Sequence, residues 1–161
     1  MMRNFVMTVA ALSSINSAAS ATNLDLLVRY LVPVFLAQDF TEACRAADPG
    51  FLTELPHGAR SVDEASSTMK AEITNGLDRD EAAAIVLAAA NTALLAAKSE
   101  VAKLSPDYPR VEQSVLKQWC HANAEPYVLN VLKTNEKGHE EFLKLISKAK
   151  ASGHGAGFVI K

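Results

Sequence analysis

Hydrophobic residues recur along most of the chain at intervals of three and four positions, which is the spacing of one face of an α-helix. The pattern predicts helices over residues 23–47, 61–75, 78–104, 110–122 and 126–150. Because Pro33 lacks a backbone donor, we expect it to divide the first of these segments into two pieces. No segment requires a strand. The pattern therefore predicts an all-α fold, in which four or five helices form one compact bundle over residues 22–151.

The segment 78–104 has the strongest helical pattern, and Asp78 followed by Glu81 is typical of a helix start. Small and large apolar residues alternate along one predicted seam at Ala83, Leu87, Ala90, Leu94, Ala97, Val101 and Leu104. The 16 residues from 82 to 97 are uncharged, which predicts a central helix buried on most sides. They would span about 24 Å against a hydrocarbon core of about 30 Å, so we predict that this helix does not cross a membrane.

The segment 126–150 is amphipathic, with Pro126 suited to its first turn and Gly138 allowing a kink over residues 135–138. Its predicted inward stripe is Val128, Leu132, Asn135, His139, Phe142, Ile146 and Ala149. Its predicted solvated side carries Lys133, Lys137, Lys144 and Lys148. In the shorter segment 110–122, the residues predicted to face inward are Val111, Val115, Trp119 and Ala122, with Cys120 beside them.

The N-terminus has the three parts of a cleaved signal peptide. Arg3 gives a positive start, residues 5–12 are apolar, and Ala19-Ser20-Ala21 is a small-x-small cleavage site. We expect cleavage after Ala21, which removes residues 1–21 and leaves an exported protein, periplasmic or secreted, that begins at Thr22. An ordinary N-terminal helix or a membrane anchor is the competing interpretation, but the apolar part is less than half the length of a bilayer span.

Cys44 and Cys120 are the only cysteines, and both lie in the predicted mature chain. An even number of cysteines in an exported protein favours a disulfide bond. Their pairing would connect the helix before Asp48 to the helix that carries Trp119. The alternative is a pair of buried free thiols. A redox-active dithiol is not expected, because the chain has no CxxC motif.

Two segments lack helical periodicity. Residues 48–60 are predicted to be the longest linker, and they begin with the turn-forming sequence Asp48-Pro49-Gly50. Residues 152–161 are rich in glycine and are predicted to form a flexible C-terminal tail. This glycine run follows a helix and has no phosphate-loop spacing, so it does not predict a nucleotide site.

The charge balance argues against nucleic acid as a partner. The chain has 16 basic and 18 acidic residues, a formal net charge of −2, and only 6% aromatic residues. A near-neutral chain has no overall cationic field for a polyanion, and so few aromatic residues do not provide a platform for stacking bases.

Asn135 and His139 are the most informative polar residues, because they lie four positions apart on an otherwise apolar face. With Glu136 they form a candidate polar pocket, either a satisfied internal hydrogen-bond network or part of a ligand site. Glu136 and His139 have the spacing of helical di-metal sites, but such sites need two of these motifs and further Glu residues. His121 and Glu125 are four residues apart and would need partners from elsewhere in the chain. We therefore expect no bound metal and no other cofactor.

Three classes of function follow from this pattern. The favoured hypothesis is an exported, non-catalytic helical interaction protein, such as an inhibitor, a chaperone-like factor or an envelope accessory factor, because no GxSxG or comparable catalytic motif is present. The alternative is a carrier of a small apolar ligand in a pocket between helices. A metal protein or an enzyme that uses His139, Glu136 or His121 is the least favoured class.

Overall fold

The structure is a computed structural model, and it describes residues 22–55, 60–104 and 111–152. Its helical elements are α1 (Asn23–Ala47), α2 (Val62–Gly76), α3 (Arg79–Ala102), α4 (Gln113–Trp119), the π-helical turn η1 (Cys120–Ala124) and α5 (Glu125–Ala151). The described residues contain no strand, which confirms the all-α prediction. The predicted signal peptide, the predicted helix start at Arg110 and the tail after Ser152 lie outside the described residues.

Polar side chains cap the first three helices. The Thr22 hydroxyl accepts a hydrogen bond from the backbone N–H of Asp25, and the Asp25 carboxylate accepts one from the backbone N–H of Thr22. At the start of α2, the Ser61 hydroxyl accepts a hydrogen bond from the backbone N–H of Glu64. The Asp78 carboxylate accepts a hydrogen bond from the N–H of Asp80 at 2.9 Å, so the predicted start of α3 is confirmed.

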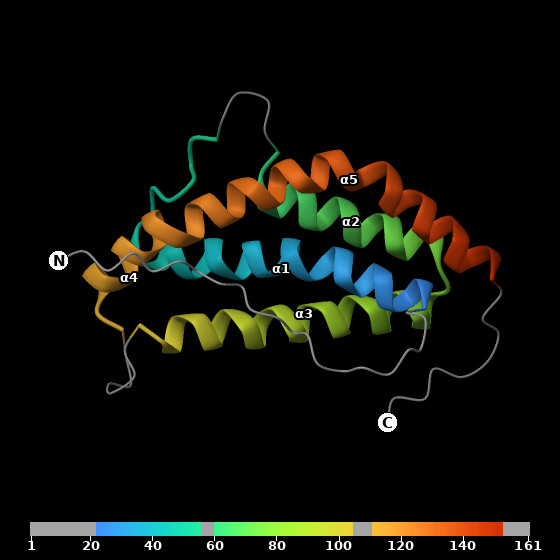
Figure 1. Ribbon diagram of the computed structural model, residues 1–161, viewed down its shortest axis with the longest axis horizontal. Coiled ribbons are helices and arrows are strands. Elements are labelled where there is room, and N and C mark those ends of the chain that lie inside the picture. The colour runs from blue at the N-terminus through green and yellow to red at the C-terminus, as the bar shows by residue number, and fades with distance from the viewer. Residues whose placement is uncertain (1–21, 56–59, 105–110, 153–161) are drawn as a thin grey trace.

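Helix α1 lies at the centre of the bundle, between α3 on one side and α2 and α5 on the other (Figure 1). The predicted break at Pro33 is wrong, because α1 continues through it. Leu31, Val34 and Phe35 around the proline are buried in the core. Their burial offsets the loss of one backbone hydrogen bond, so tertiary packing overrides the local preference of proline.

Helix α3 lies at the edge of the bundle and not at its centre, which corrects the prediction for this segment. It packs mainly against α1, and its buried residues are Ala82, Ile85, Ala89, Ala93 and Ala97. The predicted seam is wrong in part, since Ala83, Leu87 and Leu94 are exposed, whereas Ala97 is buried. Four of the five buried residues are alanines, so the contact with α1 is made by small side chains that allow a close approach.

One continuous helical rod contains α4, η1 and α5, although the sequence predicted two helices. Pro126 lies in the first turn of α5 and directly follows the π-helical turn, where the N–H of Glu125 bonds to the carbonyl of Cys120. The wider π turn accommodates a proline ring that would clash with the preceding turn of a regular helix. Helix α5 continues through Gly138, so residues 135–138 do not interrupt it.

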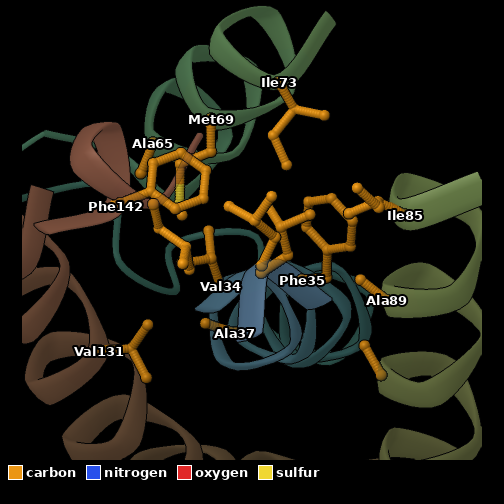
Figure 2. Packing of buried hydrophobic residues seen from close by; sticks show 14 of the residues in the cluster. Val34, Phe35, Ala37, Ala65, Met69, Ile73, Ile85, Ala89, Val131 and Phe142 are labelled. Carbon is orange, nitrogen blue, oxygen red and sulfur yellow. The ribbon is translucent and has the colours of Figure 1, made fainter. Parts of the chain in front are cut away.

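Two hydrophobic clusters fill the bundle. The main core contains Leu24, Leu27, Leu31, Val34, Phe35, Ala37, Val62, Ala65, Met69, Ile73, Ala82, Ile85, Ala89, Ala93, Val128, Val131, Leu132, Phe142, Leu145, Ile146 and Ala149. Figure 2 shows how Phe142 of α5 lies beside Met69 of α2, while Ile85 of α3 faces α1. The second cluster, called the disulfide cluster below, contains Phe40, Cys44, Phe51, Ala97, Trp119, Cys120 and Ala124.

A disulfide bond joins Cys44 of α1 to Cys120 of η1, as the sequence predicted. The two Cα atoms are 5.7 Å apart, within the usual range for a disulfide. The Phe40 ring packs edge-on against Trp119, with ring centroids 5.1 Å apart. The bond therefore connects the end of the central helix to the junction of α4 and α5.

Candidate functional site

Two of the three predicted pocket residues contact helix α2. The side-chain amide of Asn135 donates to the sulfur of Met69 at 2.9 Å, and Nε2 of His139 lies 2.6 Å from Oε1 of Glu72. Glu136 lies on the exposed side of α5, away from these contacts. Asn135 and His139 thus form polar contacts between α5 and α2.

The pair formed by Glu72 and His139 is partly buried. About a third of the His139 side chain and a fifth of the Glu72 side chain are exposed. Oε2 of Glu72 is buried and accepts no hydrogen bond from the described residues. The buried Oε2 has lost its contact with water and gains no hydrogen bond from the described residues, so burial of this oxygen is a local cost to folding, while Oε1 is compensated by His139.

A second polar cluster surrounds His121, next to the disulfide. Its Nδ1 lies 2.9 Å from Oε2 of Glu125, and its Nε2 lies 3.0 Å from Oδ2 of Asp48. The ammonium of Lys117 contacts the same Asp48 oxygen at 3.1 Å. The ring of His121 also packs edge-on against Phe51 at 5.7 Å between centroids. His121 therefore bridges two carboxylates, one from its own helix and one from the end of α1.

The electrostatics of this cluster favour a charged imidazole. Hydrogen bonds to Glu125 and then to Asp48 raise the pKa of His121 above 6.5. Hydrogen bonds from His121 and then from Lys117 lower the pKa of Asp48 below 3.8. Because these groups are at the surface, solvent and salt screen their interaction.

The local chain positions these groups. Asp48 ends α1 and begins a turn in which the N–H of Phe51 bonds to its carbonyl and the N–H of Gly50 bonds to its carboxylate. The turn predicted at Asp48-Pro49-Gly50 is therefore present. It holds the Asp48 side chain toward η1, where His121 directly follows the bonded Cys120.

In these contacts, ring nitrogens of His121 and His139 face carboxylate oxygens. Each ring nitrogen of His121 faces a carboxylate oxygen, and Nε2 of His139 faces Glu72. Among the described residues, no group of three His, Cys, Asp or Glu side chains is arranged to hold a metal ion.

The third candidate site is apolar and lies on the side of α3 that faces away from α1. This outer face consists of Ala83, Ala84, Leu87, Ala88, Asn91, Leu94 and Leu95. The exposed fractions of its leucines are 61% for Leu87, 42% for Leu94 and 69% for Leu95. Exposed apolar patches of this kind mark sites that bind other molecules.

By length and composition alone, α3 could cross a membrane, and only 28% of its most apolar stretch is buried in the bundle. The same test is passed by many core helices of proteins without membrane spans. The opposite face of α3 packs against α1, whose neighbours α2 and α5 carry many charged residues. The prediction that α3 does not cross a membrane stays a prediction.

Sequence reasoning missed Asp48, Phe51 and the outer face of α3. Asp48 is four residues after Cys44, and His121 is one residue after Cys120, so the predicted disulfide already placed the two side chains close together. The outer face was missed because apolar residues lie on nearly every side of this helix, so the sequence does not show which side is buried. Comparisons of the chain with protein-family models, with curated proteins and with solved structures each found no match.

Proposed function

We propose that this protein is an exported, non-catalytic helical interaction protein that binds another protein through the outer face of α3. The observation that carries the proposal is the exposure of Leu87, Leu94 and Leu95 on one side of a helix whose other side is packed. Burying an exposed leucine contributes about 1.5 to 3 kcal/mol, so three of them provide a strong driving force for binding.

Two features support export. A disulfide such as Cys44–Cys120 forms and persists in an oxidising compartment. The cap of α1 uses only Thr22 and Asp25, so it remains complete in a chain that begins at Thr22. Intact mass of the protein recovered from outside the cytoplasm of its own organism should correspond to a chain starting at Thr22. Recovery of a chain that still starts at Met1 would contradict export with cleavage.

The contacts of His121 and His139 support a non-catalytic role. His121 connects Asp48 to Glu125, and His139 connects α5 to Glu72. These contacts hold separate helices together, which is a structural role. The alternative function, a carrier of a small apolar ligand, is less well supported because the leucines of α3 point outward and do not line a space between helices.

The proposal is tested by site-specific photo-crosslinking in the organism that makes the protein. A photoreactive amino acid replaces Leu87 or Leu95, and the matched control replaces Leu143 of α5, which is 40% exposed. Crosslinks to a polypeptide should form at positions 87 and 95 but not at position 143. Equal crosslinking at all three positions, or none at 87 and 95, would contradict a binding role for this face.

A further inference from the structure

The outer face of α3 contains a second periodic stripe, different from the seam expected from the sequence. Its members are Asp80, Ala84, Leu87, Asn91, Leu94 and Lys98, at alternating spacings of four and three residues. All are exposed except Ala84, which is half-buried. This spacing is that of the contact positions of a coiled coil. The stripe is about 27 Å long, is apolar in its middle apart from Asn91, and has opposite charges at its two ends.

We propose that the partner of this face is a second copy of the chain, whose α3 packs antiparallel against the first in a two-fold symmetric dimer. The inference rests on the proposed function, since it names the partner of the same surface. In an antiparallel coiled coil, the contact positions oppose one another in layers. The stripe then pairs Leu87 with Asn91 of the partner subunit, and Ala84 with Leu94 of the partner subunit.

Charge complementarity selects this orientation. The same alignment places Asp80 opposite Lys98 of the partner subunit, and the two-fold axis repeats this pair at the other end. A parallel pair would instead bring Asp80 next to the partner's Asp80, and Lys98 next to the partner's Lys98. Like charges in direct opposition disfavour the parallel arrangement.

The sizes of the side chains also fit an antiparallel pair. Each leucine of the stripe lies opposite a smaller side chain, Ala84 or Asn91, so the two helices can approach closely.

A lipid surface is the competing occupant of this face. Helices that lie on membranes usually carry Lys and Arg along a solvated polar face, which strengthens binding to anionic lipids. The face of α3 opposite the leucines is instead alanine-rich and packed against α1. Lys98 is the only cation on the stripe, and Asp80 balances it. The observations therefore favour a second copy over a membrane.

The first test is sedimentation equilibrium of the mature protein up to about 1 mM, where even a dimer with a millimolar dissociation constant is well populated. The wild type should show a reversible monomer–dimer equilibrium. Leu87→Asp should weaken dimerisation by at least about tenfold, because it places a carboxylate in two layers. The matched control, Leu143→Asp on α5, should dimerise as well as the wild type. Both positions are exposed, and circular dichroism of each variant checks that it folds.

The second test uses charge reversal to determine the orientation. Asp80→Lys and Lys98→Asp should each weaken self-association, because each creates repulsion at both ends of the pair. An equimolar mixture of the two variants should restore dimerisation, since every layer again pairs opposite charges. In a parallel dimer each position faces itself, so each single variant would keep like charges at both ends, as the wild type does, and would self-associate as well as the wild type. Single variants that dimerise as well as the wild type would therefore overturn the antiparallel orientation.

The outcomes separate this inference from the proposed function. A wild type that stays monomeric at every concentration, while position 87 crosslinks a different protein, overturns the dimer and leaves the binding role of the face standing. Crosslinks from position 87 to lipid alone, with no dimer, overturn both and favour a membrane. Dimerisation that Leu87→Asp does not change also overturns the inference, because the interface then lies elsewhere.

Discussion

The main core and the disulfide cluster stabilise the bundle in different ways. The main core is built from four helices whose apolar stripes pack together, and its members from α1 lie between Leu24 and Ala37. The disulfide cluster occupies one end of α1 and combines a covalent bond, aromatic side chains and Phe51 from the loop after α1. Beside it lies the charged group of His121, Asp48 and Lys117.

This difference shows which kind of interaction each region depends on. Stability in the main core comes from the fit of side chains, so it should respond to changes in volume and hardly at all to pH or redox conditions. Stability in the disulfide cluster should respond to reduction and to the protonation of His121. Four experiments with substituted variants test this contrast, from the largest expected effect to the smallest.

The largest loss is expected for Phe142→Ala in the main core. Phe142 is almost fully buried, and removing its ring leaves a cavity that costs about 3 to 5 kcal/mol of the free energy of unfolding. Its neighbour Leu143 is exposed, so Leu143→Ala should cost under about 1 kcal/mol. Urea denaturation monitored by circular dichroism measures both. Similar losses at the two positions would show that α5 does not bury the face described here.

Removal of the disulfide should have the next largest effect. The double variant Cys44→Ala with Cys120→Ala opens a 76-residue loop and should lose about 2 to 4 kcal/mol. Trp119 is the only tryptophan and lies in the disulfide cluster, so its fluorescence reports that region.

In the double variant, the fluorescence of Trp119 should change at a lower urea concentration than the circular dichroism of the whole bundle. This order is expected because the main core does not depend on the bond. If the fluorescence and the circular dichroism of the double variant change together, at the urea midpoint of the wild type, the two clusters do not differ in this way.

A glycine pair tests how tightly the main core is packed. A Cβ atom at Gly76 would collide with the side chain of Ile146 on α5, so Gly76→Ala should cost about 1 to 3 kcal/mol. At Gly138, a Cβ atom would meet only Tyr30, at an ordinary contact distance of 3.6 Å. Gly138→Ala should therefore be neutral or stabilise the helix by up to about 1 kcal/mol. Thermal denaturation of both variants measures the two changes in stability. A Gly76→Ala variant as stable as the wild type would refute the close approach of Ile146 to Gly76.

The smallest effect is expected for His121→Gln, and it should depend on pH. The pKa of His121 is raised in the folded chain, so its contribution to stability is fully present below pH 6.5 and is lost as the pH rises through the raised value. The pKa of Asp48 is lowered, so its contribution is present above pH 3.8 and is lost as the pH falls through the lowered value.

Both contributions are therefore present from about pH 4 to about pH 6.5, where the wild type should exceed His121→Gln in stability by the largest margin. The margin should shrink toward pH 9 and in high salt, because the groups are exposed. Urea midpoints measured across this pH range give the result. A margin that does not change with pH would show that the charge of His121 does not contribute.

The sequence predicted helices well where polar and apolar residues alternate with a clear phase. The inward stripe of α5, from Val128 to Ala149, is confirmed because lysines mark its opposite side. The phase of α3 could not be predicted in the same way, since its middle carries no charge on any side. The predicted helix break at Pro33 was wrong because burial of the neighbouring side chains outweighs the tendency of proline to end a helix.

The candidate sites could be predicted only in part. The inward position of Asn135 and His139 followed from helical spacing, but their partners Met69 and Glu72 are 66 and 67 residues away in the sequence. Such contacts depend on how α2 lies against α5, which no local pattern specifies. The link from His121 to Glu125 was visible as a four-residue spacing, while Asp48 is 73 residues distant.

The π-helical turn η1 has a consequence for the evolution and engineering of this chain. Counted back from Val128 in a regular helix, positions 121 and 117 would face the core, whereas the π turn directs Trp119 and Cys120 inward and leaves His121 and Lys117 at the surface. The π turn therefore contributes one extra residue, which lets the helical segments before and after it each direct their own apolar side toward the core. An insertion or deletion at this point would rotate α4 and move Trp119 and Cys120 away from the disulfide cluster, so the bond to Cys44 constrains the chain length at this junction.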